Sequence, residues 1–170
     1  MIGYEPARWS EFALAHLGAS AALLGLVFVA LSINLRDVVG SQPLVNRAAE
    51  AVVVLASVLV TATVVLIPGQ DRGVLSAEVL AVAVVTSFAV WRLEGGSRAM
   101  GRKGDERGPS PSQVAFRRAM CLGAQLLLVV AAIALAVEAG GGLYWWPAAV
   151  VAAYVGALGN AWVLLIEILR

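Results

Sequence analysis

The stretch HLGASAALLGLVFVALSINL, residues 16–35, decides the fold class, because it is apolar over a length that fits a lipid bilayer. A helix needs about 20 such residues to cross roughly 30 Å of hydrocarbon. Within the stretch, Gly18, Gly25 and Ser32 recur at an interval of seven residues. The apolarity predicts a spanning helix, and the interval predicts a seam of small residues along one side of it.

The composition of the whole chain agrees with a membrane protein. Of its 170 residues, 61% are hydrophobic and 14% are charged, whereas a soluble domain is about 45–50% apolar and about 25% charged. The charges gather in short blocks between apolar runs. Residues 1–11 carry Glu5, Arg8 and Glu11 instead of the positive end of a cleavable signal. The first apolar run is therefore expected to remain as a spanning helix.

Five apolar segments of spanning length follow one another along the chain. Turn residues separate them, and Pro43 is expected between the first two because proline loses a helical hydrogen bond. Strands are not expected, since an open sheet in lipid leaves backbone groups unpaired. The prediction is an all-α integral membrane bundle in which residues 1–170 form a single transmembrane domain. Its five transmembrane helices are expected at about 12–35, 48–67, 74–91, 118–137 and 147–168.

Lys and Arg are divided unevenly between the two sides of a chain that crosses five times. Only Arg8 and Arg72 fall on the side of the N-terminus. Since cytoplasmic loops are enriched in Lys and Arg, the N-terminus is predicted outside and the C-terminus inside. The other side holds Arg36, Arg47, Arg92, Arg98, Arg102, Lys103, Arg107, Arg117, Arg118 and Arg170.

Aromatic residues agree with this orientation, because Trp and Tyr gather at membrane–water interfaces. Trp91 falls at the expected inner interface. The expected outer interface holds Tyr4, Trp9, Tyr144, Trp145 and Trp146.

The segment GGSRAMGRKGDERGPSPSQ, residues 95–113, predicts a flexible cytoplasmic loop. It is rich in Gly, Ser, Pro and charge, and such a segment does not bury enough apolar surface to order itself. The alternative is a docking or lipid-headgroup segment, which its excess of basic over acidic residues favours only weakly.

The residue sets that support catalysis or cofactor binding are missing from the sequence. There is one histidine, His16, and one cysteine, Cys121, so a metal site or a nucleophile with its base is not assembled. A glycine-rich phosphate loop with a lysine is also absent. We expect no enzymatic activity, no metal and no cofactor. The net charge of +1, without a basic face, predicts no nucleic-acid partner.

Polar groups inside apolar helices are the remaining candidates, because each costs free energy in lipid. His16 and Glu78 lie at similar depths below the expected outer surface and would pair if their helices touch. That pair would form a proton or cation site at the outer mouth, since histidine titrates near neutral pH. The alternative is that both side chains reach water or lipid headgroups.

Three further sets of polar residues are expected to be structural. Arg47 and Glu50, three residues apart on one helix face, predict an ion pair near the inner surface, within reach of Asn34. Gln125 and Asn160 lie at matching depths and predict an interhelical hydrogen bond worth roughly 0.6–2 kcal/mol. Hydroxyl groups within the helices are expected to bond to the preceding turn; these belong to Ser57, Thr61, Thr63, Thr86 and Ser87.

The small-residue seam of the first helix is the strongest functional candidate. Small residues let helices approach closely, so that van der Waals contacts drive their association. The seam predicts packing in a homo-oligomer or against another membrane protein. The alternative is an oligomeric ion channel with the first helix lining the pore, although Ala, Gly and Val offer an ion no polar group. The seam is defined by Glu11, Ala15, Gly18, Ala22, Gly25, Val29, Ser32 and Arg36.

Two stretches resemble known families. GASAALLGLVFVALSINL (18–35) and LVNRAAEAVVVLASVLVTATVVLIPGQ (44–70) resemble a family of small, uncharacterised bacterial polytopic membrane proteins, sometimes automatically labelled modulators of a membrane-bound AAA protease. That resemblance implies an integral membrane protein. A weaker likeness links Ala21–Leu35 to the pore helix of store-operated calcium channel subunits. Those channels have four helices and a glutamate ring, whereas Ser32 or Ile33 stands nearest that place here.

Together these features predict a non-enzymatic, multi-pass protein of the bacterial cytoplasmic membrane with an accessory or scaffold role. Its partners are expected to be the lipid bilayer and further copies of itself, with another membrane protein as the alternative.

The predicted orientation has a direct test. A reporter enzyme that works only in the cytoplasm, fused after Arg170, is expected to be active, because five crossings carry the C-terminus to the Lys- and Arg-rich side. The same reporter placed before Met1 is expected to be inactive. The reverse pattern would overturn the orientation.

Overall fold

The structure is a computed structural model that describes residues 2–100 and 111–168, and all the regular secondary structure in this part of the chain is helical. The predicted all-α fold is confirmed, with five helices long and apolar enough to cross a membrane. Short 3-10 segments accompany them near the chain start and before the last helix. The elements are η1 (Ile2–Tyr4), η2 (Pro6–Trp9), α1 (Ser10–Ile33), α2 (Leu35–Val39), α3 (Gln42–Val65), α4 (Arg72–Met100), α5 (Pro111–Ala136), η3 (Gly142–Tyr144) and α6 (Trp145–Ile168).

Three boundaries differ most from the sequence prediction. Helix α3 begins at Gln42, so Pro43 lies in its first turn. Proline is tolerated there because its missing N–H would have no partner within the helix. Helix α4 continues to Met100 and α5 begins at Pro111, so both ends of the loop predicted at 95–113 are helical. The rest of that predicted loop lies outside the described residues.

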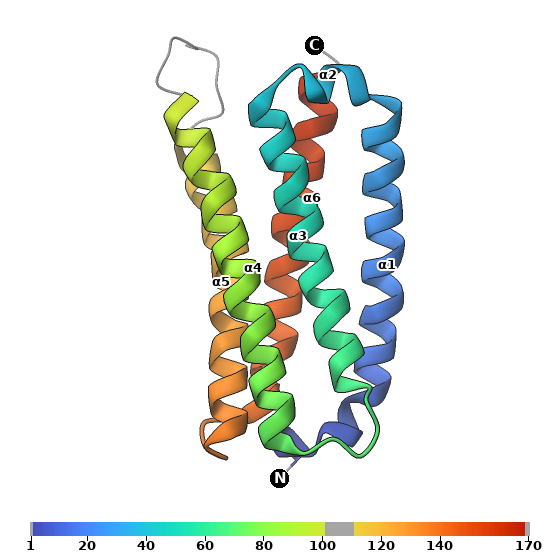
Figure 1. Cartoon of the computed structure of the whole chain (residues 1–170), viewed down its shortest axis with the longest axis vertical. Helices are drawn as coiled ribbons and strands as arrows, with labels where there is room; N and C mark the ends of the chain where they lie inside the picture. The colour runs from blue at the N-terminus through green and yellow to red at the C-terminus, as the bar shows by residue number, and fades with distance from the viewer. Residues whose placement is uncertain (1, 101–110, 169–170) are drawn as a thin grey trace.

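Four of the helices form an antiparallel bundle. Helix α3 packs on α4, α4 on α5, α5 on α6, and α6 returns to α3, which closes the ring. Figure 1 shows these helices running side by side along the long axis, with the start of α1 and the end of α6 at opposite ends of the molecule.

Helix α1 lies outside this ring and packs mainly on α3 (Figure 1). The burial of the helices reflects that arrangement. Only 11% of the apolar window of α1 is buried, against 56% in α3, which contacts helices on three sides. The bundle side of α1 carries Ala13, Ser20 and Val27, all buried and again seven residues apart.

The core depends on small side chains that let the helices approach closely. Alanines such as Ala83, Ala124 and Ala153 are almost fully buried among valines and leucines. Helices α5 and α6 approach closely at one point, where a Cβ added to Gly156 would lie 2.7 Å from the Sγ of Cys121. No real Cβ occupies that space, so glycine is required at position 156.

This contact predicts different effects for two glycines of α6. Gly156→Leu is expected to lower the free energy of unfolding by about 1–3 kcal/mol, because overpacking moves α5 away from α6. Gly159→Leu is the matched control, since a Cβ there meets nothing within 4 Å. Denaturant unfolding in detergent, followed by circular dichroism, measures both. Equal stabilities of the two variants would contradict the close approach.

Candidate functional site

The small-residue seam of α1 faces away from the bundle. All eight of its residues, from Glu11 to Arg36, are exposed in the single chain. A Cβ added to Gly18 or Gly25 would meet no atom within 4 Å, apart from the helix's own backbone. The bundle side of α1, described above, lies on the opposite side of the helix. The seam therefore does not pack within the chain and is available to lipid or to another protein.

The predicted pair of His16 and Glu78 does not form, and each side chain has a different partner. The Nδ1 of His16 lies 3.1 Å from the Oη of Tyr154 on α6, and the ring packs on Phe12 with centroids 4.2 Å apart. Glu78 accepts a hydrogen bond from Gln70 in the α3–α4 loop. The predicted contact does not form because α1 packs on α3, and α4 lies beyond α3 (Figure 1).

Gln125 joins three helices near the middle of the bundle. Its Oε1 accepts a hydrogen bond of 2.6 Å from Thr86 of α4, and its Nε2 donates to Ser57 of α3 at 3.3 Å. Asn160 is fully buried on α6. Gln125 thus links helices as expected, but its hydrogen bonds reach α3 and α4 and not the predicted Asn160.

A second cluster of polar residues lies toward the end of the bundle where α3 begins. Glu50 is 2% exposed, Arg47 is half-buried, and their predicted ion pair stays a prediction. The expected link to Asn34 is replaced by a local bond, because Asn34 donates to the carbonyl of Ala30. Sequence reasoning missed Asn46, whose amide donates to the carbonyl of Leu93 on α4.

Sequence reasoning also missed a buried ion pair at this end. Arg118 of α5 lies 3.3 Å from Glu94 of α4, and the Glu94 side chain is 2% exposed. The signal was present, because Glu94 falls just after the apolar part of α4 and Arg118 just before that of α5. Two antiparallel neighbours bring such positions to one level.

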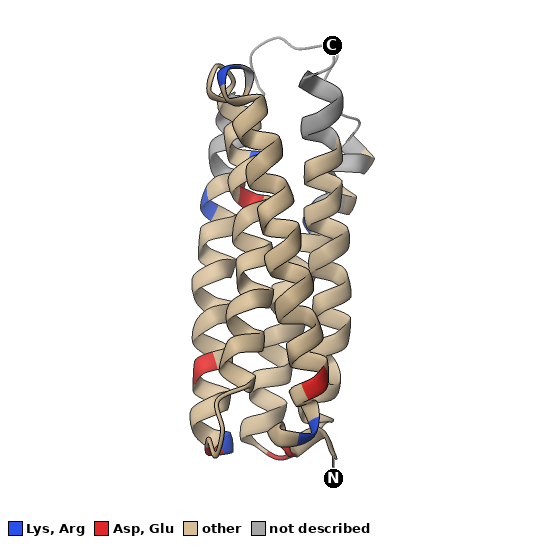
Figure 2. Ribbon diagram, turned by 90° about the vertical axis from the view of Figure 1, so that its right-hand side faces the viewer, with Lys and Arg blue, Asp and Glu red and all other residues tan. Residues whose placement is uncertain are grey.

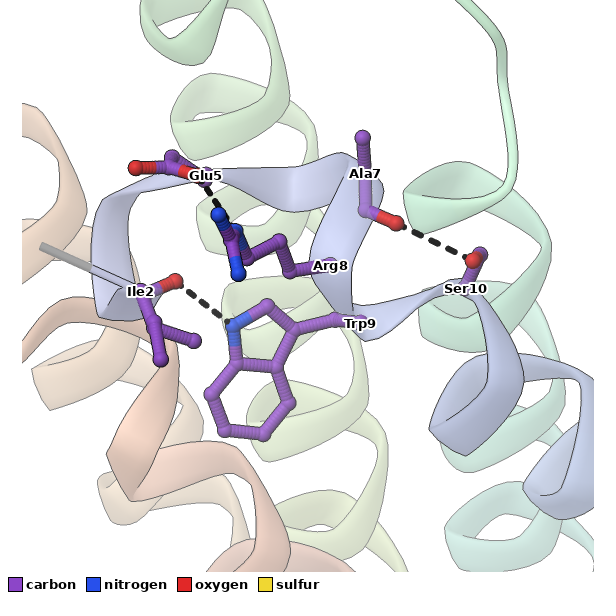
Figure 3. Close-up of polar contacts among 6 residues, drawn as sticks. All are labelled: Ile2, Glu5, Ala7, Arg8, Trp9 and Ser10. Carbon is purple, nitrogen blue, oxygen red and sulfur yellow. Dashed lines mark hydrogen bonds and ion pairs between the residues drawn. The ribbon is translucent and has the colours of Figure 1, made fainter.

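Residues 2–9 lie at the opposite end, and Figure 3 shows polar contacts within this segment and with Ser10. The indole Nε1 of Trp9 donates to the carbonyl of Ile2 at 3.0 Å, and the Ser10 hydroxyl donates to the carbonyl of Ala7 at 3.0 Å. Arg8 donates to Glu5 at 2.7 Å, and this hydrogen bond and positive charge hold the pKa of the Glu5 carboxyl below its ordinary value. These contacts fold the segment onto itself, so that Ile2 lies beside Trp9.

This segment is also tied to the loop before α6. Gly141 donates its backbone N–H to the Tyr4 hydroxyl at 2.9 Å, and a side chain on Gly142 would collide with the carbonyl of Gly3. Trp9 packs edge-on against Tyr144, with ring centroids 5.4 Å apart. The residues of the expected aromatic belt therefore share one end of the bundle, and some of them form direct contacts.

The charged residues of the described helices also lie toward the ends of the bundle. Figure 2 shows Lys, Arg, Asp and Glu toward both ends of the bundle, with the middle of the described helices free of them. Among the described residues, no group of three His, Cys, Asp or Glu side chains is placed to hold a metal ion.

Comparisons with protein-family models, with curated proteins and with solved structures find no match to this chain. The fold and the composition of its helices define a multi-pass helical membrane protein with five spans, in contact with a lipid bilayer.

Proposed function

We propose that this protein is a non-enzymatic membrane scaffold that self-associates through the small-residue seam of α1. One observation carries the proposal: the seam is exposed along its whole length, although its glycines have the spacing of a helix–helix contact. Glycine costs helix stability relative to alanine. Because the fold does not use Gly18 or Gly25 for close packing, their benefit is expected in a contact outside the chain.

The surroundings of the seam support this use. Helix α1 is attached to the bundle by one face, and its other sides are open to a second copy. Lipid is as apolar as leucine, so close van der Waals packing drives association in a membrane, and small residues permit it. Glu11 and Arg36 lie at the two ends of the seam, where water or headgroups solvate their charges.

The proposal keeps the orientation and location expected from the sequence. The N-terminus lies outside and the C-terminus inside a bacterial cytoplasmic membrane. The proposal includes an accessory role toward another membrane protein, which would bind a surface other than the seam.

An ion channel lined by α1 is the second candidate, favoured by the exposure of Glu11 above a glycine-containing stripe. Its weakness is chemical, since Ala22, Gly25 and Val29 give a dehydrated ion no compensating group. Single cysteines at positions 18, 22, 25 and 32, in a Cys121→Ala background, distinguish the two. Labelling of all four by a water-soluble thiol reagent supports the channel, and protection of all four supports the packed seam.

A leucine in the seam tests the scaffold directly. Gly25→Leu is expected to convert the oligomer to a monomer, because a bulky side chain keeps the helices apart. The fold is expected to persist, since position 25 has open space within the chain. The measurement is mass in mild detergent by light scattering, with circular dichroism as the check on folding.

Gly159→Leu is the matched control, because Gly159 is also exposed with open space but lies on α6. It is expected to keep the oligomer of the natural protein. A monomeric natural protein, or a Gly25→Leu variant with unchanged mass, would contradict the proposal.

A further inference from the structure

The face of α3 that points into the four-helix bundle carries a polar stripe, defined by Asn46, Glu50, Ser57 and Thr61. At 3.6 residues per turn, the four positions fall within an arc of about 60°. Each is buried, with exposures of 8%, 2%, 1% and 1%. Polar groups in such surroundings are costly unless they are hydrogen-bonded, and in membrane bundles they mark polar pathways.

Cross-helix contacts show that the polar stripe faces the bundle interior. Gln42, exposed at the start of α3, donates to Asn46 at 3.1 Å, and Asn46 donates to the carbonyl of Leu93 at 3.3 Å. About three turns deeper, Ser57 accepts the hydrogen bond of Gln125 from α5. The exposed Gln42 thus contacts the first residue of the stripe, Asn46, and the last residues of the stripe lie in the middle of the bundle.

Thr61 ends the stripe and behaves differently from the neighbouring hydroxyl residues. Thr63 and Thr86 donate to the carbonyls of Leu59 and Val82, one turn back. The Oγ1 of Thr61 is buried and has no hydrogen-bond partner among the described residues, contrary to the sequence prediction. A buried hydroxyl without a partner costs about 1–3 kcal/mol, and internal water is the usual group that satisfies it.

Groups able to hydrogen-bond to water lie one turn before Thr61 and on the neighbouring helix α5. Ser57 lies one turn before it, about 6 Å along the helix, a separation that one water molecule bridges with two hydrogen bonds. The amide of Gln125 carries two N–H donors, and Ser57 accepts one of them. Beyond Thr61 the core is apolar, with Val65, Leu75 and Val79 almost fully buried.

We propose that the interior of the four-helix bundle binds a file of water molecules. The file is entered at Gln42, passes Asn46 and Glu50, and ends between Gln125 and Thr61. It is closed toward the other end, where the buried hydroxyl of Ser76 donates to the carbonyl of Ala132 at 2.8 Å. The aqueous phase on the side where α3 begins therefore reaches the middle of the membrane, whereas the opposite side does not.

Water-edited solid-state NMR of the labelled full chain in lipid bilayers tests the file, because magnetisation passes from water only to nearby side chains. The Thr61 and Gln125 signals are expected to rise several-fold faster than the signals of two control residues. These are Thr63, which is exposed on the same helix, and Val58, which is buried in the apolar core. If Thr61 and Gln125 rise no faster than Val58, the interior is dry and the proposal is overturned.

Thr61→Val gives a second, independent readout, with Thr63→Val as its matched control. If Thr61 binds water, removal of its hydroxyl group slows the transfer of magnetisation from water to Gln125. Thr63→Val is expected to leave that transfer unchanged. In a dry core, Thr61→Val would replace an unsatisfied hydroxyl by a methyl group and raise the unfolding temperature without affecting transfer. That outcome would overturn the proposal.

Discussion

Close packing of small side chains around α3 is the constraint on which the other helices depend. Ala51, Val54 and Ala62 of α3 are fully buried, and α3 contacts α1, α4 and α6. In lipid, apolar side chains gain little by leaving the solvent, so helices associate where their surfaces fit closely and where polar groups bond across them. Helix α3 provides both, because its polar stripe bonds to α4 and α5 while its alanines and valines admit close neighbours.

The two faces of α1 follow from the same principle. Ala13, Ser20 and Val27 form a small-residue face against the bundle, and Gly18, Ala22 and Gly25 form another on the opposite side. The glycines of the outer face make no close contact within the described part of the chain. Under the proposed self-association, α1 would act as a connector, with one face packed on the bundle and the seam in contact with a second copy.

Hydropathy and length are sufficient to predict the five helices, because the thickness of the membrane sets how long an apolar run must be to span it. Neighbour relations were not predictable in the same way. Equal depth suggested a contact between His16 and Glu78, but depth places a residue along the membrane normal and does not say which helices touch. The spacing of the small residues predicts the seam. It does not predict whether the seam faces the bundle or points away from it, since a heptad of small residues fits an internal and an external contact equally well.

Local chemistry explains the other differences. Pro43 lies in the first turn of α3, where proline is tolerated, and not between two helices as its sequence context predicts. Thr61 does not make the backbone hydrogen bond that helical threonines usually make. The contacts of Gly3 and Gly142 at the chain start depend on two segments distant in sequence, so no local pattern predicts them. Glu94 and Arg118 were recognisable in principle, once α4 and α5 are treated as a hairpin.

Disulfide cross-linking between copies tests the central claim, that the seam is a contact between α1 helices, most directly. Gly25→Cys in a Cys121→Ala background is oxidised in native membranes and analysed on a non-reducing gel, with Gly159→Cys as the control on α6. The seam contact predicts a disulfide-linked dimer for Gly25→Cys and a monomer for Gly159→Cys. A monomer at position 25, or equal cross-linking at both positions, would contradict it.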